Sequence, residues 1–289
     1  MQTVTVIILI LCAAALLVLL ALMLAMRPLR RTHPVVRQYM KGLYAHRGLY
    51  DVEKGIPENS LAAYDRAASN GFGMELDVRL TADGQLVMLH DNNAERMTGE
   101  NVLISEISAE RACSLHLRGT EQCIPRFEQM LSTVAGRVPV LIELKINKGD
   151  SYAKCGELCE KVCDALEGYD GPFMLESFDP RAIYWLKRHR PELARGQLVT
   201  YYRRHGDQCP PVLDFLLANA MFNIFTRPDF IAVHYEDRNA LFIRLSRALY
   251  GVCEFQWTIN SPEKQRESEK IGAVPIFERY IPGQDGGRL

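Results

Sequence analysis

The chain has no strong excess of charge of either sign. Its 34 Lys and Arg residues and 35 Asp and Glu residues leave a formal net charge of −1 over 289 residues. It therefore lacks the basic field that typically attracts nucleic acid, and we expect no nucleic-acid partner. Low-complexity tracts and internal repeats are also absent, which excludes a repeat architecture. The composition does not define an oligomeric state.

Charge is absent altogether from residues 6–26, and so is proline. An apolar run of this length matches the roughly 20 residues that cross a bilayer core as a helix. A signal peptide would begin with positive charge, but the first six residues contain neither Lys nor Arg. We therefore predict a transmembrane anchor over residues 1–26.

Positive charge appears only after this apolar run. The basic residues nearest to it are Arg27, Arg30, Arg31, Arg37 and Lys41. The positive-inside rule then places the carboxyl-terminal side in the cytoplasm. We expect a single-pass membrane protein in which a basic linker, residues 27–41, leads to a catalytic domain, residues 42–289, that faces the cytoplasm.

The eight cysteines include no C-x-x-C pair, so a thiolate metal site lacks support. Cys155, Cys159 and Cys163 recur every four residues. This spacing places them close together along one side of a helix. Small apolar side chains on the buried face of that helix are the simpler interpretation. Reduced thiols agree with a cytosolic domain.

Extended and helical patterns alternate after the linker. The nine segments with strand-like patterns are 42–45, 74–80, 85–89, 138–144, 172–177, 196–201, 230–234, 252–259 and 273–277. The segments with helix-like patterns are 60–70, 126–134, 152–166, 180–189, 212–225, 240–249 and 262–270. Such alternation is typical of parallel β-α units.

About eight strands in roughly 245 residues favour an α/β fold of the TIM-type (β/α)8 barrel class. One of the nine candidate strands then lies outside the barrel. A doubly wound open sheet is the structural alternative. In a barrel, the active site lies at the carboxyl-terminal ends of the strands. Polar side chains collect near such ends: His46, Glu75, Asp77, His90, Glu143 and Lys145.

Glu75 and Asp77 are two residues apart in one predicted strand, so both side chains point to the same face. Two buried carboxylates repel each other unless a proton or a cation neutralises them. Glu143, at the end of another predicted strand, supplies a third oxygen ligand. Three carboxylates without a cysteine favour Mg²⁺ or Ca²⁺ over zinc. A surface ion pair is the alternative for any one of them, but it does not suit two acids in an apolar strand.

Two histidines and two cations lie close to these acids in the sequence. His46 and His90 suit general acid and base roles because their usual pKa lies near physiological pH. Arg47 can hold a phosphate oxygen with its fork of donors, and Lys145 can neutralise charge that develops in a transition state. Glu58 precedes a predicted helix, where it is either a polar contact of the site or part of the helix start. Together these residues predict metal-assisted cleavage of a phosphate ester.

These residues belong to a series of motifs. The motifs are His46-Arg47-Gly48, Pro57-Glu58-Asn59-Ser60, Glu75-Leu76-Asp77-Val78, Thr81-Ala82-Asp83-Gly84, His90-Asp91 and Glu143-Leu144-Lys145. In this order they resemble the glycerophosphodiester phosphodiesterase family. The resemblance continues through Ile124-Pro125, Glu176-Ser177-Phe178-Asp179 and Trp257-Thr258-Ile259-Asn260. It therefore covers residues 43–260.

The resemblance implies a TIM barrel that uses a divalent cation to hydrolyse glycerophosphodiesters to glycerol 3-phosphate and an alcohol. Carried over position by position, the family's roles are acid–base catalysis for His46 and His90, phosphate binding for Arg47 and Lys145, metal binding for Glu75, Asp77 and Glu143, and a polar contact for Glu58. The family closes with a Gly-Ile-Ile-Thr-Asp-like strand, whereas this chain has Ala273-Val274-Pro275-Ile276-Phe277-Glu278-Arg279. Because the Thr-Asp pair is missing, no role is carried over to this strand.

Two other functions are open at this point. An anchored active site can also act on lysophospholipids, as a lysophospholipase D. The apolar segment 212–225, which follows Arg203-Arg204-His205, either touches the membrane or, more simply, buries its apolar face on the barrel. A membrane-tethered binding protein on an inactive scaffold is the third possibility, but such a protein would be expected to lack a metal carboxylate or a histidine.

Overall fold

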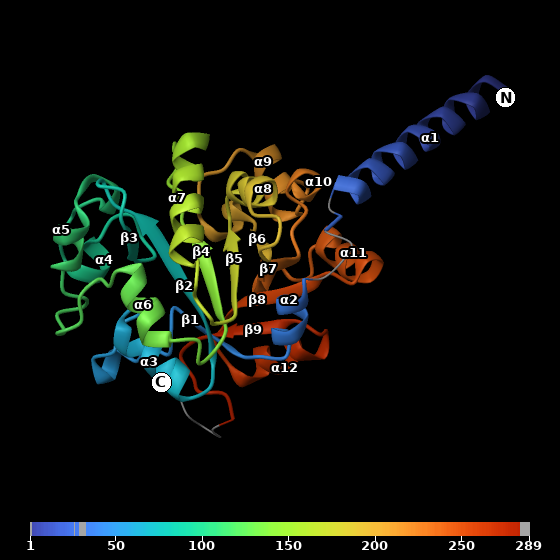
Figure 1. Ribbon diagram of the computed structural model, residues 1–289. Helices are drawn as coiled ribbons and strands as arrows, with labels where there is room; N and C mark the ends of the chain where they lie inside the picture. Colours follow the sequence, from blue (N-terminus) through green and yellow to red (C-terminus); the bar gives the residue numbers. More distant parts are fainter. Residues whose placement is uncertain (1, 26, 29–32, 284–289) are drawn as a thin grey trace.

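Eight parallel strands form a closed barrel in the computed structural model, which describes residues 2–25, 27–28 and 33–283 (Figure 1). The barrel strands are β1 (Tyr44–His46), β2 (Gly73–Leu80), β4 (Val140–Leu144), β5 (Phe173–Ser177), β6 (Arg195–Val199), β7 (Phe230–His234), β8 (Cys253–Ile259) and β9 (Val274–Phe277). Strand β1 pairs in parallel with both β2 and β9, which closes the sheet. The prediction of a TIM-type barrel is confirmed, and the open doubly wound sheet is excluded.

One of the nine predicted strands, the segment 85–89, forms β3 (Leu86–Met88). It lies outside the barrel and pairs antiparallel with β2. The prediction that His90 ends one of the barrel strands is therefore wrong. The antiparallel return still brings His90 back along β2, because the backbone N–H of Leu89 donates to the carbonyl of Asp77 at 3.2 Å. A tight turn at Gly84, whose φ is +68°, makes this return possible.

The structure also contains helices, most of which surround the barrel, whereas α1 projects away from it (Figure 1). They are α1 (Gln2–Ala25), α2 (Pro34–Tyr39), α3 (Leu61–Ser69), α4 (Glu95–Thr98), α5 (Ala109–Cys113), α6 (Phe127–Val134), α7 (Tyr152–Ala165), α8 (Pro180–His189), α9 (Pro211–Ala218), α10 (Asn223–Thr226), α11 (Leu241–Tyr250) and α12 (Pro262–Lys270). The predicted helix over 212–225 is split into α9 and α10, because Ala220 between them adopts a left-handed φ of 55°. The three cysteines of α7 are buried, as predicted.

The period of two along β2 separates its apolar and polar side chains. Met74, Leu76 and Val78 pack outward against the helices, in a core cluster that also contains Met130 of α6. The alternate residues, which include the predicted metal ligands of this strand, point into the barrel. One strand therefore stabilises the fold on one face and supplies polar groups to the interior on the other.

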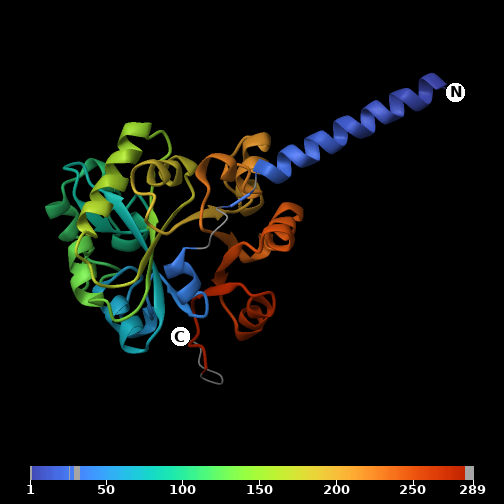
Figure 2. The same ribbon diagram turned by 45° about the vertical axis from the view of Figure 1, so that its right-hand side comes forward.

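The amino-terminal end of the barrel is plugged by α2, which lies within the predicted basic linker. Val36 of α2 is fully buried in a cluster with Tyr44, Phe230 and Phe255. Tyr44 and Phe230 begin β1 and β7, and Phe255 lies within β8. The rings of Tyr44 and Phe255 meet edge to face at 5.3 Å. Figure 2 shows α2 against the barrel, whereas α1 projects away from it. The apolar plug leaves the carboxyl-terminal end of the barrel for polar chemistry.

A separate small cap, residues 91–126, connects β3 to α6 and contains α4 and α5. It has an apolar cluster of its own, formed by residues that include Met97, Ile104 and Leu117. No helix was predicted in this segment from the sequence, because both of its helices are five residues long or shorter. The cap stands beside the carboxyl-terminal side of β2, where it contributes side chains to the site.

The predicted apolar span forms a continuous helix, α1. Within it, Thr3–Ala25 is long and apolar enough to cross a membrane, and its central window is not buried by the rest of the protein. By length and composition alone, such an amino-terminal helix is either an anchor or a signal sequence. Parts of the predictions lie outside the described residues: Met1, Met26, Arg30, Arg31 and the tail from 284 to 289.

Candidate active site

Three buried carboxylates converge inside the barrel. Glu75 and Asp77 point inward from β2, and Glu143 points inward from β4, where it is the register neighbour of Asp77. One oxygen of each lies within 4.8 Å of the others. Burial raises the pKa of Glu75 well above its usual range, and the charges of Asp77 and Glu143 raise it further. The carboxylates therefore repel one another, and a bound proton or a cation would reduce this repulsion.

Lys145 supplies part of that neutralisation. Its Nζ lies 2.8 Å from Oε1 of Glu143 and 3.1 Å from Oδ1 of Asp77. Although burial disfavours the charged ammonium, Asp77 and Glu143 raise the pKa of Lys145. Burial likewise opposes the ionisation of Asp77, yet Lys145, His90 and Arg47 hold the pKa of Asp77 well below its usual range. Lys145 is therefore a fixed positive charge beside the carboxylates.

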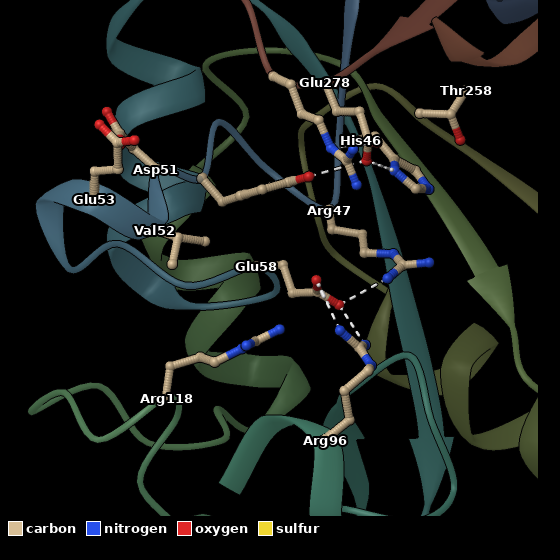
Figure 3. A pocket seen from close by; sticks show the side chains of 12 residues that line it. His46, Arg47, Asp51, Val52, Glu53, Glu58, Arg96, Arg118, Thr258 and Glu278 are labelled. Atoms are coloured by element: carbon tan, nitrogen blue, oxygen red, sulfur yellow. Dashed lines mark hydrogen bonds and ion pairs between the residues drawn. The ribbon is translucent and has the colours of Figure 1, made fainter. Parts of the chain in front are cut away.

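Arg47 is held at the entrance to the cluster by two carboxylates. Its backbone has a left-handed φ of 57°, and its N–H donates to Oε2 of Glu75 at 3.1 Å. Its guanidinium donates to Oε1 of Glu58 at 2.7 Å. Glu58 also accepts from Arg96 of α4 at 2.6 Å, so it lies between two guanidinium groups (Figure 3). Glu58 thus orients cations of the site and is not a member of the carboxylate cluster.

One ring nitrogen of His46 contacts a carboxylate, and the other faces the carboxylate cluster. Its Nδ1 lies 2.9 Å from Oε2 of Glu278 (Figure 3). Its Nε2 lies 3.8 Å from Oε2 of Glu75. Burial lowers the pKa of His46, and Arg47 lowers it further, whereas Glu278 raises it. Burial opposes the ionisation of Glu278, but the hydrogen bond and charge of His46 bring the pKa of Glu278 down to about 2. The hydroxyl of Tyr50 donates to the same carboxylate oxygen at 3.0 Å.

Glu278 was not predicted as a site residue. It directly follows β9, the strand whose sequence departs from the family pattern, and no role was carried over to it. The signal that would have found it is an acidic residue at the end of a barrel strand. Because β9 closes the barrel against β1, that position faces His46.

His90, like His46, has a carboxylate neighbour on its ring, in this case Asp91. Its Nδ1 lies 2.7 Å from Oδ1 of Asp91, and Oδ2 of Asp91 accepts from Nε of Arg96 at 2.5 Å. The backbone carbonyl of His90 accepts from Nε of Arg79 at 2.9 Å. Arg79 follows Asp77 on the inward face of β2, so it ties the turn after β3 to the barrel. Each predicted catalytic histidine therefore has a carboxylate partner on Nδ1.

Two further buried residues bear on the cluster and were not predicted as site residues. Glu176 of β5 is the register neighbour of Glu143, and neither of its oxygens has a hydrogen-bond partner in the described part of the chain. Burial raises the pKa of Glu176 well above its usual range, with Glu75 and Glu143 adding to the effect. Asn59 donates to Oδ2 of Asp77 at 2.7 Å and so fixes that carboxylate.

The polar groups line two neighbouring cavities. The inner cavity, of about 80 Å³, is lined by residues that include His46, Arg47, Glu75, His90, Glu143 and Glu176. Aromatic rings of Phe178 and Trp257 form another part of its wall and meet edge to face at 5.4 Å. The outer cavity, of about 490 Å³, shares His46 and Arg47 and extends to Arg96, Arg118 and Arg279. An anionic ligand that enters the outer cavity therefore meets several guanidinium groups.

The carboxylate cluster fits a hard divalent cation. All three donors are oxygens of buried acids, and no thiolate is among them. Carboxylate oxygens are the ligands that Mg²⁺ and Ca²⁺ prefer. Beyond the effect of burial, the charges of Asp77 and Glu143 raise the pKa of Glu75, and a bound cation would offset that repulsion. The sequence-based prediction that Glu75, Asp77 and Glu143 come together is borne out by this geometry.

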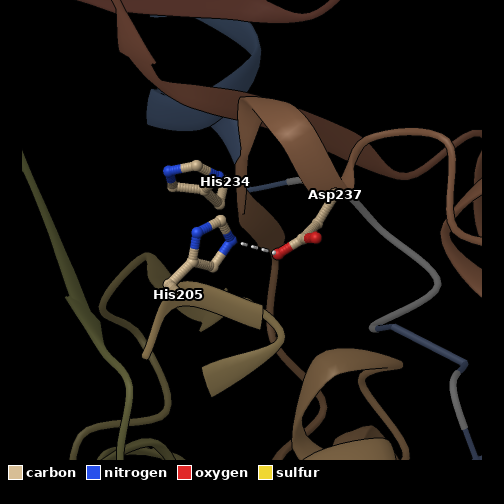
Figure 4. Close-up of side chains that lie close together, drawn as sticks. All are labelled: His205, His234 and Asp237. Atoms are coloured by element: carbon tan, nitrogen blue, oxygen red, sulfur yellow. Dashed lines mark hydrogen bonds and ion pairs between the residues drawn. The ribbon is translucent and has the colours of Figure 1, made fainter. Parts of the chain in front are cut away.

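A second group of titratable side chains lies after β6 and β7 (Figure 4). Nε2 of His205 is 3.1 Å from Oδ2 of Asp237, and the rings of His205 and His234 are 4.1 Å apart. The same Oδ2 accepts from the hydroxyl of Thr200 and from the N–H of Tyr201, both at 2.9 Å. The guanidinium of Arg204 bonds the other oxygen of Asp237. Because this carboxylate already has four donors, the group ties two loops together and suits a cation less well than the buried triad does.

The sequence model of the glycerophosphoryl diester phosphodiesterase family matches residues 46–279 of this chain. The chain belongs to this family. The match begins at His46 and ends one residue after Glu278, so it includes both partners of the contact between β1 and β9. The family resemblance seen in the sequence is confirmed.

Relatives of the family extend over most of the barrel. A glycerophosphodiester phosphodiesterase of Caldanaerobacter subterraneus is 29% identical over 242 residues, which are 81% of this chain and 91% of that protein. The mouse glycerophosphodiester phosphodiesterase 1 is 32% identical over 82% of this chain and 77% of its own length. A human lysophospholipase D is 32% identical over 119 residues, only 36% of this chain and 37% of that protein.

Solved structures of the family share the fold. A phosphodiesterase of Oleispira antarctica, in complex with the product sn-glycerol-3-phosphate, has a TM-score of 0.67 at 21% identity and covers 84% of this chain and 94% of its own. A glycerophosphodiester phosphodiesterase of Thermotoga maritima has a TM-score of 0.61 at 23% identity and covers 81% of this chain and 93% of its own. At these identities the likeness supports the TIM-type barrel alone.

Proposed function

We propose that this protein is a metal-dependent hydrolase that converts glycerophosphodiesters to glycerol 3-phosphate and an alcohol. One observation carries the proposal: two carboxylate-bound histidines, Arg47 and the carboxylates of Glu75 and Glu143 line one inner cavity, and Asp77 and Lys145 lie directly against these carboxylates. This combination suits a phosphodiester, which needs its anionic charge balanced, a nucleophile deprotonated and a leaving group protonated. Membership of the phosphodiesterase family supports the same reaction class.

The two histidines share the proton transfers. With Nδ1 of His46 bound to Glu278, its Nε2 is the nitrogen available to the substrate. With Nδ1 of His90 bound to Asp91, its Nε2 is available in the same way. One imidazole removes the proton from the attacking hydroxyl, and the other protonates the departing alcohol. Attack by the 2-hydroxyl of glycerol gives a cyclic phosphate that water opens in a second step.

Arg47 and Lys145 hold the phosphate. Glu58 fixes the guanidinium of Arg47 so that its remaining donors are aimed at the cavity. Nζ of Lys145 lies 5.9 Å from the centre of the Phe178 ring, which lines the inner cavity. Both cations are pre-positioned by carboxylates, so little reorganisation is required when negative charge develops on the phosphate.

Glu75, Asp77 and Glu143 are the proposed ligands of Mg²⁺ or Ca²⁺. A divalent cation bound there would polarise the phosphodiester and acidify a coordinated hydroxyl or water. Asn59 keeps Asp77 in place for this role. Glu58 lies outside the cluster, because both of its oxygens are engaged by guanidinium groups.

The direct test is a phosphodiesterase assay of the purified protein against a panel of glycerophosphodiesters. We expect release of glycerol 3-phosphate that EDTA abolishes and that added Mg²⁺ or Ca²⁺ restores. Turnover that survives complete chelation would argue against the cation site. Binding of the diesters without any turnover would instead favour a binding protein on this scaffold.

A lysophospholipid is the alternative substrate within the same chemistry. The amino-terminal apolar helix and the partial match to the human lysophospholipase D favour including it. Glycerophosphocholine and a lysophosphatidylcholine have the same phosphodiester and differ in the acyl chain. A higher kcat/KM for the second compound would assign lysophospholipase D activity.

The membrane organisation is part of the proposal. Residues 1–26 form the anchor, 27–41 the basic linker, and 42–289 the catalytic domain, which faces the cytoplasm. The support is the uncharged helix followed by basic residues. In inside-out vesicles, external protease should digest the domain readily; protection would place it on the other side. A mature protein that begins after the apolar run would identify a cleaved signal sequence.

A further inference from the structure

Exposed apolar side chains gather on α9, α10 and α11. Seven of the eleven exposed large apolar side chains described outside α1 lie on these three helices. They are Val212, Leu213, Phe215, Ile224, Phe225, Leu241 and Leu249, and we refer to them as the apolar surface. Val212 is 72% exposed and Phe225 is 59% exposed, although each lies on a helix that packs against the barrel. Two of these helices meet at the rings of Phe215 and Phe242, which lie 5.7 Å apart. A gathering of exposed apolar side chains usually marks a binding surface.

The apolar surface adjoins the end of α1. Leu22, Met23 and Ala25 are partly buried in a cluster with Met221 and Phe242, the inner residues beneath this surface. The hydroxyl of Tyr250 donates to the carbonyl of Met23 at 2.7 Å. These contacts fix the last turn of α1 against α10 and α11, so a bilayer that α1 crosses begins beside the apolar surface (Figures 1 and 2).

Positive charge lies among and beside the apolar side chains. Lys187 and Arg188 of α8, Arg227 at the end of α10 and Arg244 of α11 form no salt bridge with any carboxylate in the described residues. Burial lowers the pKa of Lys187, and Arg227 and Arg188 contribute to the lowering. Cations that crowd one another without acidic partners are complementary to an anionic surface.

We propose that the apolar surface is a membrane-docking surface, which inserts into the headgroup region of an anionic leaflet beside α1. The inference rests on the proposed anchor but concerns a separate part of the chain. Interfacial helices bury their apolar side chains roughly 5–10 Å into a bilayer while basic residues contact anionic headgroups. Here α9, α10 and α11 supply the apolar side chains, and the basic ones come from α8, from the residue that ends α10 and from α11.

A bilayer suits this surface better than a second copy of the chain. In a symmetric dimer the same patch meets itself, so the unpaired cations of one copy would face those of the other. An anionic leaflet offers opposite charge to every one of them. Attachment through both α1 and the apolar surface would also fix how the barrel is oriented on the membrane.

The test uses the full chain reconstituted into vesicles of phosphatidylcholine and phosphatidylglycerol with brominated acyl chains. The variants F225W and V212W place a tryptophan on the apolar surface. The control I271W places one at Ile271, which is 38% exposed and directly follows α12. Figure 1 shows α12 on a different side of the barrel from α1. The emission of Trp185 and Trp257 in the unmodified chain is subtracted as background.

We expect F225W and V212W to lose roughly half of their added emission to the brominated lipid, and I271W to lose almost none. If F225W and V212W lost no larger fraction of their added emission than I271W, the docking surface would be overturned, whether or not α1 is inserted. Chemical cross-linking between copies through the apolar surface without quenching would also overturn it. Flotation of the unmodified chain after an alkaline wash tests the anchor separately: release of the chain disproves the anchor, whereas the quenching decides the docking surface. Phosphodiesterase activity in the same sample reports on the active site.

Discussion

Oε2 of Glu278 lies 2.9 Å from Nδ1 of His46, across the seam where the last barrel strand pairs with the first. The contact orients the imidazole so that its Nε2 faces the carboxylate cluster. A carboxylate on the far nitrogen of a catalytic histidine fixes the tautomer and stabilises the imidazolium. Glu278 is thus a positioning residue that acts through His46.

Replacing Glu278 tests this relationship. Glu278→Gln should lower kcat/KM roughly 10- to 100-fold, as the loss of comparable carboxylate partners does. Because Glu278 raises the pKa of His46, the limb of the pH profile that reports His46 should move to lower pH in the variant. The measurement is kcat/KM from about pH 4 to about pH 9, because this range brackets the ordinary pKa of histidine.

The matched control for Glu278 is Tyr50→Phe, which removes one hydrogen bond to the same carboxylate and leaves its charge. Its pH profile should stay close to that of the unmodified protein. A Glu278→Gln profile that superimposes on the parent profile would show that the contact does not tune His46.

The acid–base assignment predicts large losses from two single changes. His46→Ala and His90→Ala should each reduce kcat by roughly 10²- to 10⁴-fold, because each removes a proton-transfer group. His116→Ala is the control: its imidazole lies on the cap, where Nδ1 contacts the carbonyl of Thr120. Circular dichroism should show that all three variants keep the fold. Substantial turnover in either active-site variant would rule out the proposed role of that histidine.

The cation site can be tested without measuring activity. Addition of Mg²⁺ or Ca²⁺ should raise the unfolding temperature of the parent protein, because a ligand at about 100 times its Kd stabilises the folded state by about 2.7 kcal/mol. Glu75→Gln and Asp77→Asn should abolish this shift. Glu278→Gln should keep it, since Glu278 is outside the triad. A shift that survives in the triad variants would place the cation elsewhere.

Glu176 predicts a pH-dependent difference in stability. Its pKa in the folded state is raised above the ordinary value of 4.5, so the parent protein loses stability as the pH rises through and beyond that value. Glu176→Gln mimics the neutral acid and avoids this loss. In EDTA, its advantage in the free energy of unfolding should grow by about 1.4 kcal/mol per pH unit between pH 5 and the folded-state pKa.

Denaturant titrations at several pH values measure this difference. Glu128→Gln on the exposed face of α6 is the control for the loss of a carboxylate that is not buried. A constant gap for Glu176→Gln would mean that the buried carboxyl stays ionised, held by a partner.

Local patterns in the chain predicted most of the elements. The alternation along β2 identifies both its strand character and the inward face of Glu75 and Asp77, because side chains in a strand repeat every two residues. Asp179 before Pro180 predicts the start of α8, and its side chain accepts from the N–H of Arg181 as an N-cap does. Such features depend on neighbours within a few residues, and short-range chemistry decides them.

The place of His90 shows where local patterns end. Its segment has the apolar pattern of a strand, and nothing in that pattern distinguishes a barrel strand from a hairpin partner. The direction of β3 depends on the short turn at Gly84, which returns the chain along β2. His90 reaches the site from the side of the barrel, together with Asp91 and Arg96 of the cap.

The sequence by itself determined the apolar amino-terminal helix, the alternation of strands and helices, and the acids, histidines and cations of a phosphodiester site. Only the tertiary structure decided that Glu278 binds His46 and that Glu176 is buried beside Glu143 with no hydrogen-bond partner among the described residues. It also decided that the end of α1 packs in one cluster with side chains of α9 and α11. The physical reason is barrel closure. It joins residues as far apart in the chain as His46 and Glu278, and such contacts depend on strand register and packing that no local pattern records.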